Sequence, residues 1–313
     1  MKLFIGYFKE YFNKDFNLLQ HLLVFFFIGL CLFLNYSYDL YPDYVRISNR
    51  TELGILKQWG MYSFAFLVPL LIIGVTQKQK WAIIKPNYVL IGLLGLVFVS
   101  VDVSYYLMNF HKLLVESDSV YYRFSHACLS NLVSLFSVVI PLIILYNLIK
   151  IFHPEWYGLK LNGAPIKPYV WIILIMIPIV FLASFQEGFT KYYPSFSKSL
   201  VDGIPYPDWL KVGIYELCYG FDFFSVELFF RGFMVVALSR FVGKEAILPM
   251  VACYAFLHFG KPWMEAFSSI FGGFALGILA YKSRNIYGGL LVHLGVAWGM
   301  EIAAFAQIKW LLN

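Results

Sequence analysis

The sequence predicts an all-α polytopic membrane protein. Of its 313 residues, 60% are hydrophobic and only 13% are charged, and the mean hydropathy is +0.71. This composition is too apolar for a soluble domain, and the apolar residues fall in stretches close to the ~20 residues that a bilayer-crossing helix needs. Aromatic residues make up 20% of the chain, which suits aromatic belts at the two membrane interfaces.

The apolar stretches predict about eight to nine transmembrane helices. The stretch at 245–259 is short and contains Pro249, and the stretch at 168–184 contains Pro178. The stretch at 209–239 is long for one crossing, so we expect this helix to be tilted or to extend beyond the bilayer. The predicted spans are 18–36, 59–76, 88–108, 126–151, 168–184, 209–239, 245–259, 264–282 and 286–312.

The distribution of positive charge indicates how the chain is oriented. The net charge of +6 is spread over many short loops, which favours membrane topology over a nucleic-acid-binding patch. With the N-terminus in the cytoplasm, the cytoplasmic loops are the shorter ones and carry more Lys and Arg, so we expect this orientation. The first apolar stretch begins late and runs too long for a cleavable signal peptide, so we expect it to be the first membrane helix.

Two polar connections divide the chain into three predicted parts. Residues 1–152 form accessory transmembrane helices, and residues 153–208 form a connector with one helix and an extramembrane loop. Residues 209–313 form the core, which contains the candidate functional residues. The chain has no internal repeat, which argues against a transporter built from repeated halves.

The four cysteines predict free thiols. Cys31, Cys128, Cys218 and Cys253 each lie in an apolar run, and none belongs to a C-x-x-C pair. This pattern favours buried thiols over a disulfide framework or a zinc site.

Glu227 and Arg231 are the first candidate site residues. They lie four residues apart in an apolar stretch, so their side chains can meet on one helix face. A buried ion pair contributes little net stability because desolvation offsets the attraction. Ionisable groups inside a membrane therefore indicate a functional site more often than a structural lock.

Two histidines stand in later apolar stretches. His258 lies directly before Phe259-Gly260-Lys261-Pro262, where a helix must break and polar backbone groups must face protein or a cavity. His293 lies one turn after Gly288-Gly289, where a neighbouring helix can approach closely. Both histidines are candidates to bind a water or a metal.

The order of these residues resembles the CPBP family (CAAX protease and bacteriocin-processing, also called ABI), which includes the Rce1-like prenyl-protein proteases. That family has the motifs Glu-Glu-x-x-x-Arg, aromatic-x-x-x-His and His-x-x-x-Asn on successive membrane helices. The matching segments here are Val226-Glu227-Leu-Phe-Phe-Arg231, Tyr254-Ala-Phe-Leu-His258 and His293-Leu-Gly-Val-Ala297. The stretch Trp156-Tyr-Gly-Leu159 also resembles a segment that often precedes this core.

The resemblance implies a CPBP-like helical core and an intramembrane endopeptidase that cleaves a membrane-proximal peptide. In similar proteins the first glutamate and the second-motif histidine, here His258, activate a water. The second glutamate and the arginine, here Glu227 and Arg231, hold the first motif in place. The third-motif histidine, here His293, stabilises the oxyanion together with the asparagine. The expected partners are the lipid bilayer and a membrane-associated peptide or protein. A divalent metal is a candidate cofactor, with His258 and His293 as its only plausible ligands.

Two motif positions depart from the family pattern. Val226 replaces the first glutamate and Ala297 replaces the asparagine, and the loss of a general base typically lowers a rate by ~10²–10⁴. A π-bulge can re-aim Glu227, or another carboxylate can substitute for the missing one. The third alternative is a pseudoprotease that binds or regulates a membrane partner without cutting it. The candidate substitutes are Asp102, Asp222 and Glu301, of which Glu301 shares a helix face with His293.

Overall fold

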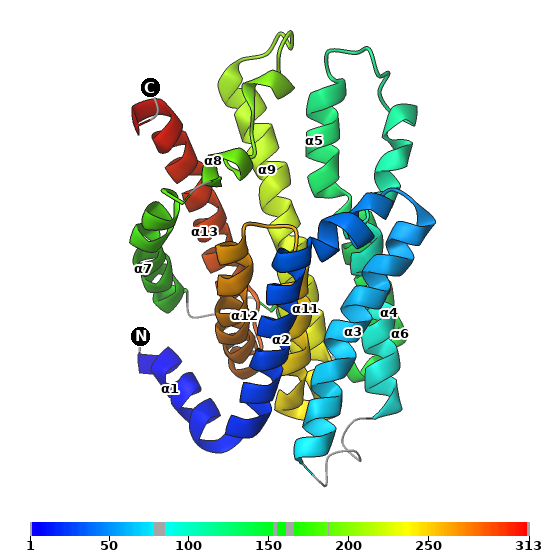
Figure 1. Cartoon of the computed structure of the whole chain (residues 1–313), viewed down its shortest axis with the longest axis vertical. Helices are drawn as coiled ribbons and strands as arrows, with labels where there is room; N and C mark the ends of the chain where they lie inside the picture. Colours follow the sequence, from blue (N-terminus) through cyan, green and yellow to red (C-terminus); the bar gives the residue numbers. More distant parts are fainter. Residues whose placement is uncertain (1, 78–84, 153–154, 161–165, 187, 312–313) are drawn as a thin grey trace.

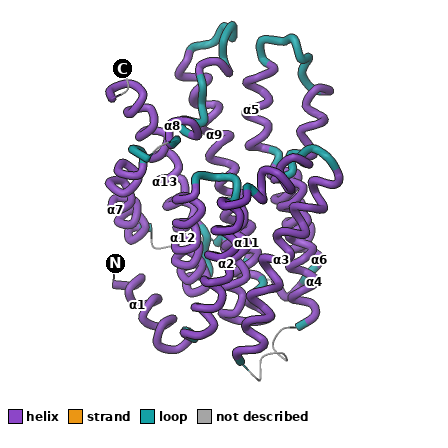
Figure 2. The backbone as a smooth tube through the Cα atoms, in the orientation of Figure 1, coloured by secondary structure: helices purple, strands orange, loops and turns teal. Residues whose placement is uncertain are grey.

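The computed structural model describes residues 2–77, 85–152, 155–160, 166–186 and 188–311. Within these ranges every regular element is a helix, which confirms the predicted all-α class (Figures 1 and 2). Parts of the predicted connector, residues 153–154 and 161–165, lie outside the described residues.

Six described helices are long and apolar enough to cross a membrane. The shorter apolar helix α7, Lys167–Ala183, packs against α13. The predicted total of eight to nine spans stays a prediction. The six candidate spans are α2 (Leu18–Tyr38), α3 (Glu52–Thr76), α4 (Pro86–Val103), the continuous segment Tyr122–Leu148 that begins with α5 (Tyr122–Leu132) and ends with α6 (Ile140–Leu148), α12 (Trp263–Ser283) and α13 (Tyr287–Ala306).

Local signals define the ends of these helices. The Asn17 side chain caps α2 by accepting from the Gln20 amide at 3.1 Å, and Thr51 caps α3 in the same way through Gly54. Pro86 stands at the first position of α4, where its missing N–H costs nothing.

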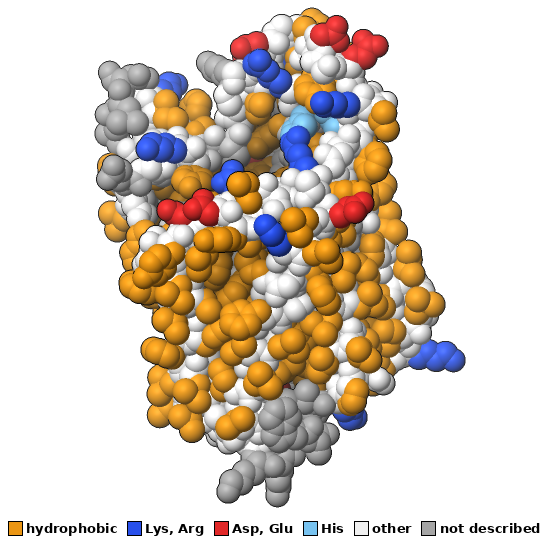
Figure 3. Space-filling view, turned by 45° about the vertical axis from the view of Figure 1, so that its right-hand side comes forward, with side chains coloured by type: hydrophobic (Ala, Val, Ile, Leu, Met, Phe, Trp, Pro, Cys, Tyr) orange, Lys and Arg blue, Asp and Glu red, His pale blue; other side chains and the backbone are white. Residues whose placement is uncertain are grey.

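The outer surface is apolar, as expected of a protein surrounded by lipid. Large hydrophobic side chains on the spans are exposed, among them Phe26 and Phe33 on α2 and Leu182 on α7. Figure 3 shows hydrophobic side chains over the middle and lower part of one face, while most charged side chains gather above them. Together with the six candidate spans, this surface identifies a multi-pass integral membrane protein.

The core of the molecule surrounds α11, Ile247–Leu257. This short helix is buried on every side from Ile247 to Phe256, and it packs against α2, α3, α12 and the π-helix Leu228–Ala237. A helix that is apolar all round belongs in a protein interior. It ends at Leu257, so the predicted break at His258 is confirmed.

The remaining helices frame this core. The long helix α9, Asp208–Glu227, continues directly into the π-helix, and α10, Ser239–Val242, leads on to α11. Helix α1, Lys2–Glu10, precedes α2, and α8, Phe189–Tyr192, lies in the loop after α7. All four cysteines are free, with Cys128 and Cys253 buried and the other two half-buried.

The described part of the connector ties the π-helix to the start of α13. Gly158 has a φ of +77°, a conformation that favours glycine, and its carbonyl accepts from the Ile286 amide at 3.2 Å. The Tyr157 carbonyl lies so close to Gly232 that a Cβ at position 232 would be 2.8 Å from it. The connector therefore fixes two elements of the core at once.

We predict that the α7–α13 contact tolerates no side chain at position 288. A Cβ on Gly288 would lie 1.9 Å from the ring of Tyr169, a buried residue of α7, so Gly288→Ala should destabilise the protein by about 1–3 kcal/mol. Thermal unfolding of the purified protein in one detergent measures this change. Gly272→Ala on α12 is the matched control, because no atom lies within 4 Å of its Cβ. Equal unfolding temperatures for the two variants would contradict the predicted contact.

Candidate functional site

The ion pair of Glu227 and Arg231 lies at the junction of α9 and the π-helix. Glu227 is the last residue of α9, and the π-helix begins at Leu228. Arg231 Nη1 lies 2.9 Å from Glu227 Oε1, and the two side chains are 1% and 0% exposed. The predicted contact is therefore confirmed, and both charges are fully desolvated. π-Helical turns occur frequently at functional sites.

Glu227 also contacts His293 on α13. Its Oε1 lies 3.0 Å from His293 Nδ1, so the imidazole donates an Nδ1–H to the carboxylate. Gly289, one turn earlier on α13, lies against the same carboxyl group, and a Cβ there would be 2.5 Å from Glu227 Oε2. The absence of a side chain at position 289 is what allows α13 to approach this close.

Tyr254 on α11 joins the ion pair to both histidines. The Arg231 guanidinium lies over its ring, 4.2 Å from the centroid, in the geometry of a cation–π contact. The Tyr254 hydroxyl lies 3.4 Å from His293 Nε2. The sequence analysis identifies Tyr254 only as the aromatic residue of the second motif. Its distance along the chain from Arg231 and His293 does not predict these contacts.

His258 lies at the C-terminal end of α11, beside Tyr254. Its Nδ1 is 2.8 Å from the Tyr254 carbonyl, and the two ring centroids are 4.7 Å apart. A carbonyl can only accept, so Nδ1 carries the proton and Nε2 of the neutral ring keeps its lone pair. Because α11 is short, its last turn reaches the level of His293, and Tyr254 contacts both histidines.

The donor atoms of this site do not fit a metal centre. Among the described residues no group of three or more His, Cys, Asp and Glu side chains is arranged to hold an ion. Catalytic zinc sites use three protein ligands, whereas His258 and His293 supply two. We therefore assign no step to a divalent metal.

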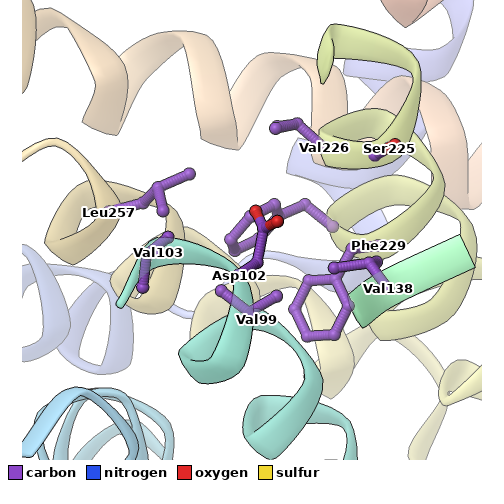
Figure 4. A pocket seen from close by; sticks show the side chains of 9 residues that line it. Val99, Asp102, Val103, Val138, Ser225, Val226, Phe229 and Leu257 are labelled. Carbon is purple, nitrogen blue, oxygen red and sulfur yellow. The ribbon is translucent and has the colours of Figure 1, made fainter. Parts of the chain in front are cut away.

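The two positions that depart from the family pattern lie in different surroundings. Val226 lines a small cavity together with Asp102 of α4 (Figure 4). Ala297 on α13 is buried, with 1% of its surface exposed, and its methyl group offers no hydrogen bond.

The three candidate substitute carboxylates have different partners. Glu301 accepts from the amide and the hydroxyl of Ser195, both at 2.8 Å, so it anchors the loop before α9. Asp222 lies within electrostatic range of Lys261 and of Asp102. Asp102 accepts from the Ser137 hydroxyl at 2.9 Å. Of the three, Asp102 is the one that shares a cavity with Val226.

A comparison with known families identifies this region. The family model described as type II CAAX prenyl endopeptidase, Rce1-like, matches residues 217–299. The match begins in α9 and ends in α13, so it includes Glu227, His258 and His293. It confirms the resemblance that the motifs predict and supports a CPBP-type membrane protease scaffold for this part of the chain. No curated protein and no solved structure gives a significant match to the chain.

We predict that substitutions of Glu227 and Arg231 have strongly coupled effects on the free energy of unfolding. Arg231→Met leaves a buried carboxylate without its counter-charge, which should destabilise the protein by about 3–5 kcal/mol. Adding Glu227→Gln to Arg231→Met should recover most of this loss, because the uncompensated charge is then gone. Denaturant unfolding of both single variants and the double variant in one detergent measures the coupling.

Lys14→Met serves as the control for a lost ion pair at the surface. Its partner Glu10 lies 3.9 Å away and both side chains are exposed, so the change should stay below about 1 kcal/mol. Simple additivity of the Glu227 and Arg231 substitutions would show that the two charges do not depend on each other.

Proposed function

We propose that the protein is an intramembrane endopeptidase that cleaves a membrane-proximal peptide. The observation that carries the proposal is the convergence of His258 and the Glu227-bound His293 on Tyr254. Two imidazoles held through Nδ1 present their Nε2 atoms for chemistry. This site lies within the segment that matches the Rce1-like family of type II CAAX prenyl endopeptidases. We also propose that the N-terminus lies in the cytoplasm, as the distribution of Lys and Arg predicts.

In the proposed reaction His258 is the general base. Its Nε2 takes a proton from a water while the water oxygen forms a bond to the scissile carbonyl carbon. When the C–N bond breaks, the same imidazolium returns the proton to the leaving nitrogen. The hydrogen bond from Nδ1 to the Tyr254 carbonyl holds the ring in the tautomer that this role needs.

His293 and Tyr254 supply the electrophilic side of the site. Glu227 holds His293 by Nδ1, so the protonated ring can donate Nε2–H to the developing oxyanion. The Tyr254 hydroxyl lies beside this nitrogen and supplies a second donor. Arg231 orients Glu227 through the 2.9 Å ion pair. This arrangement supplies donors that Ala297 cannot.

A pseudoprotease is the second candidate. The observation that favours it is that two motif positions carry apolar side chains, which can neither donate nor accept a proton. Val226 lines a cavity, and Ala297 is buried. Such a protein would keep the scaffold and bind a membrane-associated peptide or protein without hydrolysis.

Peptide cleavage by the purified protein in lipid vesicles tests the proposal. We expect wild-type protein to cut members of a diverse library of membrane-proximal peptides, and His258→Ala to lower the rate by about 10²–10⁴. His126→Ala is the matched histidine control, since His126 on α5 contacts Arg50 at 3.1 Å and lies outside the site. If the wild-type protein cleaves no peptide and the Val226→Glu variant does, the protein is a pseudoprotease instead.

A further inference from the structure

Two of the four free cysteines face each other across the contact between α5 and α9. Cys128 lies on α5 and Cys218 in the middle of α9, and their thiols are within hydrogen-bonding reach of each other. The other two cysteines, Cys31 and Cys253, lie on α2 and α11. The sequence does not predict this pair, because the two positions are ninety residues apart.

A second pair of small side chains fixes how the two helices lie against each other. Figure 1 shows α5 beside the first half of α9, and the two helices are in contact. Ser134, in the same continuous segment as α5, donates from its hydroxyl to Ser225 Oγ at 3.0 Å. Ser134 follows Cys128 by six residues and Ser225 follows Cys218 by seven, so both pairs fit one parallel register. Small side chains at such positions let helix backbones approach closely, as a bond between two cysteines requires.

The proposed orientation of the chain places the start of both helices outside the cytoplasm. With a cytoplasmic N-terminus, the three candidate spans α2, α3 and α4 precede α5, so α5 begins on the opposite side of the membrane. Helix α9 begins at the same end of the molecule as α5 (Figure 1). Compartments outside the cytoplasm are those in which disulfides form and persist.

We propose that Cys128 and Cys218 form a disulfide bond between α5 and α9 when the protein meets an oxidant that itself carries a disulfide. Cys218 is half-buried and Cys128 is 8% exposed, so Cys218 reacts first. Its thiolate attacks the disulfide of the oxidant, forms a mixed disulfide and releases one thiol. The Cys128 thiolate then attacks the Cys218 sulfur and releases the second thiol. The two cysteines lose two electrons and two protons, and the oxidant is reduced to two thiols.

This bond would join an accessory helix to the core. Helix α5 lies outside residues 217–299, which match the family model, whereas Cys218 lies inside them. Helix α9 ends at Glu227, which accepts from His293. A bond that closes a loop of about ninety residues restricts the unfolded chain, so the oxidised protein should be the more stable form. The inference does not depend on whether the site cleaves peptides.

Treatment of the purified, folded protein with oxidised glutathione in one detergent tests the proposal. We expect the wild-type chain to lose the mass of two hydrogens and to retain no glutathione. Maleimide labelling after unfolding should fall from four thiols to two, and peptide mapping should find Cys128 linked to Cys218. The unfolding temperature should rise by roughly 4–8 °C, and a reductant should reverse the rise.

Serine variants of the individual cysteines provide the controls. Cys31→Ser and Cys253→Ser should still lose two hydrogens, because neither residue belongs to the pair. Cys128→Ser should instead retain one glutathione on Cys218, because the thiol that would release it is gone. Wild-type protein that keeps four free thiols, retains glutathione on Cys218 or forms the bond between two copies of the chain would overturn the proposal.

Discussion

The buried ion pair of Glu227 and Arg231 is the constraint around which the core is arranged. Neither charge reaches water, so each must be compensated by protein groups at short range. Arg231 is covered on one side by the Tyr254 ring, and Glu227 accepts from His293. Three elements, the α9–π-helix segment, α11 and α13, therefore meet at a single ion pair. The proposed hydrolytic function would need such an arrangement, because only fixed polar groups can replace the solvent inside a membrane.

The short helix α11 makes the polar interior possible. A helix that crossed the whole bilayer would carry His258 away from His293, and it would have no free backbone end at the site. Because α11 ends at Leu257, the freed carbonyls near its end accept from side chains. The Tyr254 carbonyl accepts from His258, and the Tyr36 hydroxyl donates to the Lys261 carbonyl at 2.6 Å while lying 3.3 Å from the His258 carbonyl. Irregular backbone at membrane depth is tolerated where protein surrounds it in this way.

The sequence predicts the elements well and the contacts between distant elements poorly. Runs of apolar residues locate the spans, and the spacing of Glu227 and Arg231 predicts their contact because it depends on one helix only. The pairing of Glu227 with His293 and the position of Tyr254 depend on how three helices pack, which no local pattern encodes. The same is true of Glu301, whose engagement by Ser195 requires a loop about a hundred residues earlier in the chain. Asp102 stands near the end of an apolar span, and its hydrogen bond with Ser137 and its place beside Val226 depend on how α4 packs against other helices.

The absence of a side chain at Gly289 has a consequence for how a substrate could enter the proposed site. Helices α9 and α13 are held by a 3.0 Å hydrogen bond at a point where no side chain separates them. Any lateral parting of these two helices by more than a fraction of an ångström breaks that bond and frees His293. A membrane-embedded chain therefore cannot slip between α9 and α13 and still meet an assembled site. For the proposed peptidase we therefore expect the substrate to enter from the lipid at another place in the bundle, with α9 and α13 staying together.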